Sequence, residues 1–320
     1  MPVLRLSAVI LLAVLLTACG STSEVPYKDG DAYLLQFRPS VGQVFDVEVS
    51  NTNDVQISVM GQQVPQKQMM GLSYVYAVEE GAEEGQFRIT STTERVKSQT
   101  EAMGQNFSFD SAEASDRIPP AFRPFNALVG SSVTMTVGSD GTIHTIDGLS
   151  DLTQRVMDSI DMPNPEMNEQ MRSQMEMTMG EDPMLENYRQ AFRWYPEGPV
   201  AVGDSWEQSA TTHAGFPMET ARTLTLDRVE DSIAFISFTG DVVAEESEMD
   251  MGPVSMTMNI SGSEEGSLQM DLRTGAILKM IQEISMSSSG TVSNPADPTQ
   301  EMVMDMEGVS ESTLTMALRE

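Results

Sequence analysis

Alternation of apolar and polar residues dominates the chain and predicts β-strands. Apolar side chains fall at every second position in the segments 254–260, 268–272 and 133–137. Successive side chains of a strand point to opposite faces, so each segment predicts a strand with one buried face. Turn sequences separate these segments: Gly138-Ser139-Asp140-Gly141, Glu230-Asp231-Ser232 and Arg273-Thr274-Gly275. The pattern predicts consecutive hairpins and an antiparallel sheet.

The segment 149–194 departs from this period and predicts helices. Leu152, Val156 and Ile160 recur at helical spacing, and Ser150 precedes them as a candidate N-cap of a helix from Asp151 to Ile160. After a proline-containing break, the segments 166–179 and 182–192 predict further helices. We expect this helical insert to lie between two β-rich regions.

The two β-rich regions share a motif and an order of elements. Val-Gly, two variable residues, an aromatic residue and an acid occur at 41–46 and again at 202–207. In both regions a long strand, a strand pair, a Met-Gly hairpin and a Gly-containing hairpin follow, which indicates duplication. The predicted fold is mainly β (α+β): a duplicated, curved, half-barrel-like antiparallel sheet. We expect β-rich halves at 33–148 and 195–320, with the helical insert at 149–194.

The N-terminal segment predicts secretion and lipid attachment. Arg5 precedes an apolar run from Ala8 to Leu16, and the only cysteine, Cys19, follows directly. The order of charge, short apolar run and small residues is typical of a signal peptide, here 1–18. Leu16-Thr17-Ala18-Cys19 resembles the lipobox of bacterial lipoproteins, which implies acylation of Cys19. Residues 19–32 are then a lipidated tether.

The lipobox resemblance also implies a location. Gly20 stands where an aspartate would resemble the inner-membrane retention signal of some Gram-negative bacteria. We therefore expect a protein held by its lipid on the outer membrane and facing the periplasm. The membrane is its first expected partner, and the covalent lipid is its only expected prosthetic group.

Charge and the scarcity of reactive residues exclude several functions. The formal net charge of −30 disfavours nucleic acid and anionic lipid surfaces as partners. With Cys19 acylated, a serine nucleophile would need a base, and His144 and His213 are the only histidines; neither a nucleophile-elbow motif nor a Ser-x-x-Lys pair is present. We therefore expect a protein that is not an enzyme and has no cofactor. A hydrolase that uses a carboxylate pair remains an alternative, because the 48 acids contain many possible pairs.

Methionine is the residue type that most needs an explanation, because the chain has 26. The simplest interpretation is that methionine fills the apolar positions of strands. A second is a flexible apolar ligand site, because unbranched thioethers adapt to varied shapes. A third is Cu(I) handling by soft sulfur ligands. The candidate ligand site comprises Met167, Met171, Met175 and Met179. The candidate copper ligands are Met256, Met258, Met302, Met304 and Met306.

The segments 125–149 and 195–209 carry a family resemblance. From about Tyr33 to Leu318, the chain resembles uncharacterised bacterial envelope lipoproteins that are classed as a domain of unknown function. The resemblance supports an envelope location and the β-rich fold, and it implies no catalytic motif. We expect the concavity between helices and sheet to bind an apolar small molecule or an envelope protein. The segments 151–160 and 167–179 are the candidate cover of that concavity.

Overall fold

A computed structural model describes most of the chain from Tyr27 to Arg319. The described ranges are 27–59, 62–102, 104–113, 118–160, 164–213, 217–250, 255–294 and 297–319. Twelve of the described strands form one antiparallel sheet, and three short strands form a second sheet. The expected mainly β fold with an open antiparallel sheet and a few helices is confirmed.

The large sheet is an up-and-down meander whose first and last long strands pair with each other. Along the sheet the strands are β10 (Ser205–His213), β11 (Pro217–Glu230), β12 (Ile233–Asp250), β13 (Ser255–Asp271), β14 (Ile277–Asn294), β15 (Asp297–Leu318), β3 (Val44–Val59), β4 (Gln62–Glu80), β5 (Gln86–Ala102), β7 (Ser132–Gly138) and β8 (Ile143–Asp147). β6 (Gln105–Asp110) pairs with β5 beside β7. The pairing of β15 with β3 joins the two halves of the chain into one continuous sheet.

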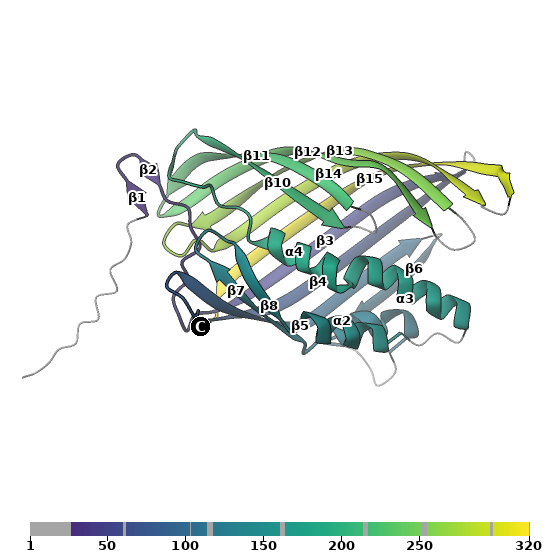
Figure 1. The fold of residues 1–320 in the computed structure, drawn as a ribbon, viewed down its shortest axis with the longest axis horizontal. Helices are drawn as coiled ribbons and strands as arrows, with labels where there is room; N and C mark the ends of the chain where they lie inside the picture. The colour runs from purple at the N-terminus through teal and green to yellow at the C-terminus, as the bar shows by residue number, and fades with distance from the viewer. Residues whose placement is uncertain are drawn as a thin grey trace, which may run out of the picture.

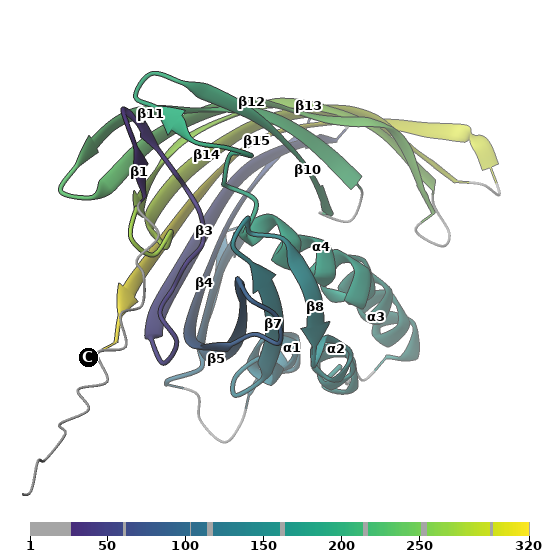
Figure 2. The ribbon, with the colours of Figure 1, turned by 60° about the vertical axis from the view of Figure 1, so that its left-hand side comes forward.

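The sheet curves into an arch that does not close, and the helices lie inside it (Figures 1 and 2). We call the face toward the helices the inward face and the opposite one the outward face. The β11–β12 and β13–β14 turns mark the proximal end of the sheet. The β3–β4 and β12–β13 connections mark its distal end.

The helices bridge the two edges of the arch. α2 (Leu149–Asp158) packs against β7, α4 (Glu181–Ala191) packs against β10, and α2 and α4 contact each other. α3 (Pro165–Met179) packs against α2 and α4. A short 3-10 turn (Pro120–Phe122) and α1 (Arg123–Ala127) lie between β6 and β7. These helices therefore cover the inward face from the sides.

The start of α2 differs from the prediction. The expected N-cap Ser150 lies inside the helix, and Gly148 takes the cap position with a φ of +86°. A side chain at Gly148 would approach the Ser132 carbonyl oxygen (2.9 Å from an ideal Cβ), so the tight entry favours glycine over a capping residue. Leu152, Val156 and Ile160 are buried as their helical spacing predicted.

The repeated Val-Gly motifs make the same turn. The Gly42 nitrogen donates to the Val78 carbonyl oxygen (2.8 Å), and the Gly203 nitrogen donates to that of Leu226 (2.8 Å). Both glycines have left-handed φ values, +88° and +93°. In the second half β13 pairs along β12, whereas in the first half β6 and β7 together pair along β5. In the first half the segment 111–131 separates β6 from β7, whereas in the second half the single strand β13 takes both of these positions.

The main core lies at the proximal end, between the sheet, the helices and the segment that precedes β3. Leu35 and Phe37 are buried there with Trp194 and Tyr195. The Phe37 nitrogen donates to the Ser139 carbonyl oxygen (2.8 Å), and the Arg38 nitrogen donates to that of Thr274 (2.6 Å). This segment therefore ties together the Gly-containing hairpins of the two halves.

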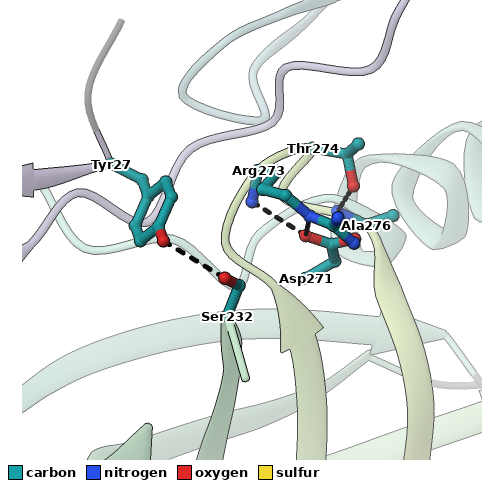
Figure 3. A network of polar contacts seen from close by, with 6 residues as sticks. All are labelled: Tyr27, Ser232, Asp271, Arg273, Thr274 and Ala276. Carbon is teal, nitrogen blue, oxygen red and sulfur yellow. Dashed lines mark hydrogen bonds and ion pairs between the residues drawn. The ribbon is translucent and has the colours of Figure 1, made fainter. Parts of the chain in front are cut away.

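Hydrogen bonds at the proximal turns hold the first described residues in place (Figure 3). The Tyr27 and Ser232 hydroxyl groups are 3.1 Å apart, so Tyr27 contacts the β11–β12 turn. In the neighbouring β13–β14 turn, the Arg273 guanidinium donates to both Asp271 carboxylate oxygens. β1 (Lys28–Asp29) pairs with β2 (Ala32–Tyr33), which pairs with β9 (Val200–Ala201). The end of the predicted tether, residues 28–32, is thus part of a small sheet.

Candidate ligand-binding face

The distal inward face is apolar and only partly covered. Along each strand from β11 to β15, every second side chain points toward the inside of the arch. The buried members are Met218, Val242, Ala244 and Ile260, and the half-buried members packed against them are Ile284, Met286, Met304 and Met306. We call these eight residues the distal apolar cluster. Half of its members remain accessible from inside the arch.

The outward face of the same strands is polar. Ile284 points inward on β14, whereas its neighbours Glu283 and Ser285 point outward. A hollow of about 890 Å³ on the outward face is lined by hydroxyl and charged residues together with Val309 and Met286. Apolar side chains are thus concentrated on the inward face, although single ones such as Ile281, Val303 and Val309 are exposed on the outward face.

A buried ion pair separates the distal apolar cluster from the proximal core. Arg222 Nη2 donates to Glu264 Oε2 (3.2 Å), and Gln282 Nε2 donates to Glu264 Oε1 (3.0 Å). The Arg222 guanidinium lies over the Trp194 ring, with its Cζ 4.6 Å from the ring centroid. Gly240 lies opposite both charged residues on β12 and leaves room for them. The inward face thus has two apolar regions with a polar boundary.

Burial decides the electrostatics of this boundary. The Glu264 side chain is fully enclosed and that of Arg222 is 9% exposed. Burial lowers the pKa of Arg222, and the charge of Glu264 opposes that shift. Arg222 Nε is buried and has no hydrogen-bond partner. The pair is therefore held by one long hydrogen bond, one amide contact and the Trp194 ring.

The predicted methionine cover is described in part. Met171 and Met175 of α3 are half-buried, while the side chains of Met167 and Met179 lie outside the described residues. α3 lies inside the arch with α4 (Figure 2). Cys19 also lies outside the described residues, so lipid attachment stays a prediction.

The candidate copper ligands are divided between β13 and β15, which β14 separates. Met304 and Met306 of β15 are half-buried and pack in the distal apolar cluster with Ile260. The side chains of Met256, Met258 and Met302 lie outside the described residues. The described contacts of this group are apolar.

The residues proposed for other chemistry are dispersed. His144 is exposed on β8, and the His213 side chain lies outside the described residues. Across the described ranges, no three His, Cys, Asp or Glu side chains group as a metal site would require. No helix among the described elements is both long and apolar enough to span a bilayer.

Comparison with known proteins identifies the family. The profile of a family of unknown function, DUF6263, matches residues 84–277. The chain belongs to this family. The matched DUF6263 segment runs from the turn before β5 to the start of β14 and includes the helices and Arg222 with Glu264. The expected membership of a family of unknown function is confirmed. Curated proteins give no match to the chain.

Solved structures show weak similarity. A structure of lipid–protein interactions in lipovitellin matches with 9% identity and a TM-score of 0.43 over 88% of this chain. The chain spans 25% of the length of that protein. Pseudomonas aeruginosa OccK5 (OpdH) matches with 6% identity and a TM-score of 0.20, over 86% of this chain and 98% of that one. The Acinetobacter baumannii outer membrane protein Omp33 matches with 9% identity and a TM-score of 0.14, over 85% and 98%.

Proposed function

We propose that this DUF6263 protein is a lipid-anchored, non-enzymatic envelope protein that holds an acyl chain against its distal inward face. The observation that carries the proposal is the distal apolar cluster, whose half-buried members Ile284, Met286, Met304 and Met306 face the inside of the arch. Each square ångström of apolar surface removed from water contributes about 25 cal/mol, so an apolar ligand that covers this surface gains free energy.

The composition of the cluster favours a flexible apolar ligand over a rigid one. Four of its eight members are methionines, namely Met218, Met286, Met304 and Met306. Their unbranched side chains can repack around chains of different length and saturation. The proximal core beyond the Arg222–Glu264 pair is already filled by buried side chains such as Phe238 and Leu268, so it leaves an acyl chain little room. The ligand is therefore confined to the distal half.

Displacement of a fluorescent fatty acid from the Cys19→Ser protein tests the binding site. Met286→Gln and Met306→Gln keep the side-chain length but place an amide on the cluster, which costs desolvation when the ligand binds. We expect each change to raise the dissociation constant of the probe at least about tenfold, or about 1.4 kcal/mol.

Met69→Gln is the matched control for this experiment. Met69 lies on β4, is 43% exposed and points to the outward face, away from Gln68 and Met70. Equal affinity of the Met69→Gln and unchanged proteins is expected. Equal weakening by all three replacements, or probe binding that no replacement changes, contradicts the assignment of the site.

Fractionation of cells that express the Cys19→Ser protein tests the anchor separately. Acyl chains hold an attached domain on a membrane because each buried methylene contributes about 0.8 kcal/mol. The unchanged protein should sediment with the membranes, and the Cys19→Ser protein should not. Membrane association that persists without the sulfur contradicts the anchor.

A further inference from the structure

The chain enters the fold at the proximal end of the arch. The Leu34 nitrogen donates to the Tyr27 carbonyl oxygen (2.8 Å), and the Tyr27 hydroxyl meets Ser232 in the β11–β12 turn (Figure 3). Eight residue steps separate Cys19 from Tyr27, and at most about 3.5 Å per residue gives a reach of about 28 Å. A lipid on Cys19 therefore holds the proximal end close to the bilayer.

The distal end lies farther from Tyr27 than this reach. β13 alone has 17 residues, which extend about 56 Å at about 3.3 Å per residue. To bring the distal end to the same bilayer, the molecule would have to lie on its side. The exposed apolar side chains of the outward face stand singly among polar ones, as Val309 does between Glu307 and Glu311, so they form scattered points of contact for a bilayer in that position.

The proximal end instead presents apolar turn tips. Val41 is 58% exposed and Val202 is 50% exposed, at the same position of the two repeated Val-Gly turns. Leu318, at the proximal end of β15, is 55% exposed. Tyr27 and Tyr33 are half-buried nearby, and tyrosine is enriched at membrane interfaces. Both halves of the duplicated fold thus offer an apolar tip at the end that holds the tether.

Three of the acids at the proximal turns pair with arginine, whereas others such as Glu80, Glu84 and Asp231 have no ion pair among the described contacts. Such pairing lowers the electrostatic cost of bringing a strongly acidic protein to a lipid surface. The pairs are Arg88 with Glu79 (3.8 Å), Arg228 with Glu230 (3.0 Å) and Arg273 with Asp271 (2.8 Å).

We infer that the proximal end is a membrane-docking surface for zwitterionic lipid, with Val41 and Val202 at the headgroup level. This inference rests on the proposed lipid anchor. The arch then stands on the bilayer, and the distal apolar cluster opens away from it toward the aqueous compartment. A ligand would be taken up or released on the side that faces other envelope components.

Spin labels on the full acylated chain in phosphatidylcholine vesicles test this surface. Because Cys19 is consumed by acylation, a cysteine introduced elsewhere is the only free thiol. Val41→Cys and Val202→Cys report the proximal tips. Val303→Cys is the matched control, because Val303 is 61% exposed on the distal part of β15. The exposure of all three valines makes the replacements tolerable to the fold.

The labels at positions 41 and 202 should collide more with oxygen, which concentrates in lipid, than with a water-soluble nickel reagent. The label at position 303 should show the reverse. Equal access of the nickel reagent at all three positions, or lipid contact at 303 alone, overturns the docking surface. Flotation with the vesicles is measured first. Loss of flotation refutes the anchor and this inference together, whereas flotation with water-exposed labels refutes the docking surface alone.

Discussion

The proximal and distal regions of the inward face are built from the same strands by the same alternation, yet they differ in closure. At the proximal end Trp194, Tyr195 and Phe192 lie against Phe238 and Phe37, and these residues are buried. At the distal end Val242 and Ile260 are buried, but the inward apolar side chains of β14 and β15 stay half-buried, as Met286 and Met306 do. The difference comes from what covers the sheet, since the helices and the segment from Leu35 to Phe37 seal the proximal end.

This comparison separates the residues that stabilise the fold from those available for binding. A fully buried inward residue has its partners within the chain, so its loss leaves a cavity. A half-buried one can still gain contacts from a ligand. The boundary is the Arg222–Glu264 pair.

The largest effect is expected at the boundary itself. Glu264→Gln keeps the shape of the side chain but leaves the buried Arg222 charge without its partner. Breaking a buried pair in this way costs about 3–5 kcal/mol in the free energy of unfolding, measured by urea denaturation. The double replacement Arg222→Met with Glu264→Met removes both charges and should recover most of that loss. If the Glu264→Gln protein had the same free energy of unfolding as the unchanged protein, the Arg222–Glu264 pair would be solvated.

The next largest loss of stability is expected when methionines on the two sides of the boundary are replaced by alanine. Met270 is 0% exposed on β13 in the proximal core, and Met270→Ala should cost about 2–5 kcal/mol in the free energy of unfolding. Met306→Ala, in the half-buried distal cluster, should cost less, because water already reaches part of its side chain. Equal losses in the free energy of unfolding for Met270→Ala and Met306→Ala would mean that the proximal and distal ends exclude water to the same extent.

The smallest effect concerns the ion pair that holds β6 to the distal half of β5. Arg95 donates to both Asp110 carboxylate oxygens, and this hydrogen bonding lowers the pKa of Asp110 to about 2. A carboxyl group with a lowered pKa stabilises the fold above its unfolded pKa of about 4, and the contribution disappears as the pH falls through about 2. The unchanged protein should therefore be more stable than Asp110→Asn at about pH 6, but not at about pH 2.

The proximal pair Arg88–Glu79 is the control for that pH series. Its two side chains are 54% and 62% exposed, so the pair contributes close to nothing. Glu79→Gln should leave urea denaturation curves unchanged at every pH. A pH-independent loss for Asp110→Asn would show that the contact is not electrostatic.

Local features of the fold could be predicted from the sequence. Alternation located the long strands, and the Glu230-Asp231-Ser232 turn has the left-handed φ values, +48° at Asp231 and +66° at Ser232, of a tight hairpin. The start of α2 was predicted less well, because the close approach to the Ser132 backbone favoured Gly148 over a capping side chain.

Long-range features needed the structure. The pairing of β15 with β3 joins strands from opposite ends of the chain, and local sequence has no signal for so distant a contact. The boundary pair did leave a signal that was missed. Arg222 falls in phase with buried Leu224 on β11, and Glu264 falls in phase with buried Ile260 and Leu268 on β13. A charge on the apolar side of two strands indicates a buried pair, although only the register shows that the two meet.

Native mass spectrometry of the protein released from its own membranes tests the binding role of the distal apolar cluster most directly. The unchanged protein should carry a bound species in the mass range of an acyl lipid, in addition to the lipid on Cys19. The protein with both Met286→Gln and Met306→Gln should lose that species and keep its fold, while Met69→Gln should retain it. An unchanged protein that carries no such species, or a double variant that binds it as well, would contradict the role of the distal apolar cluster.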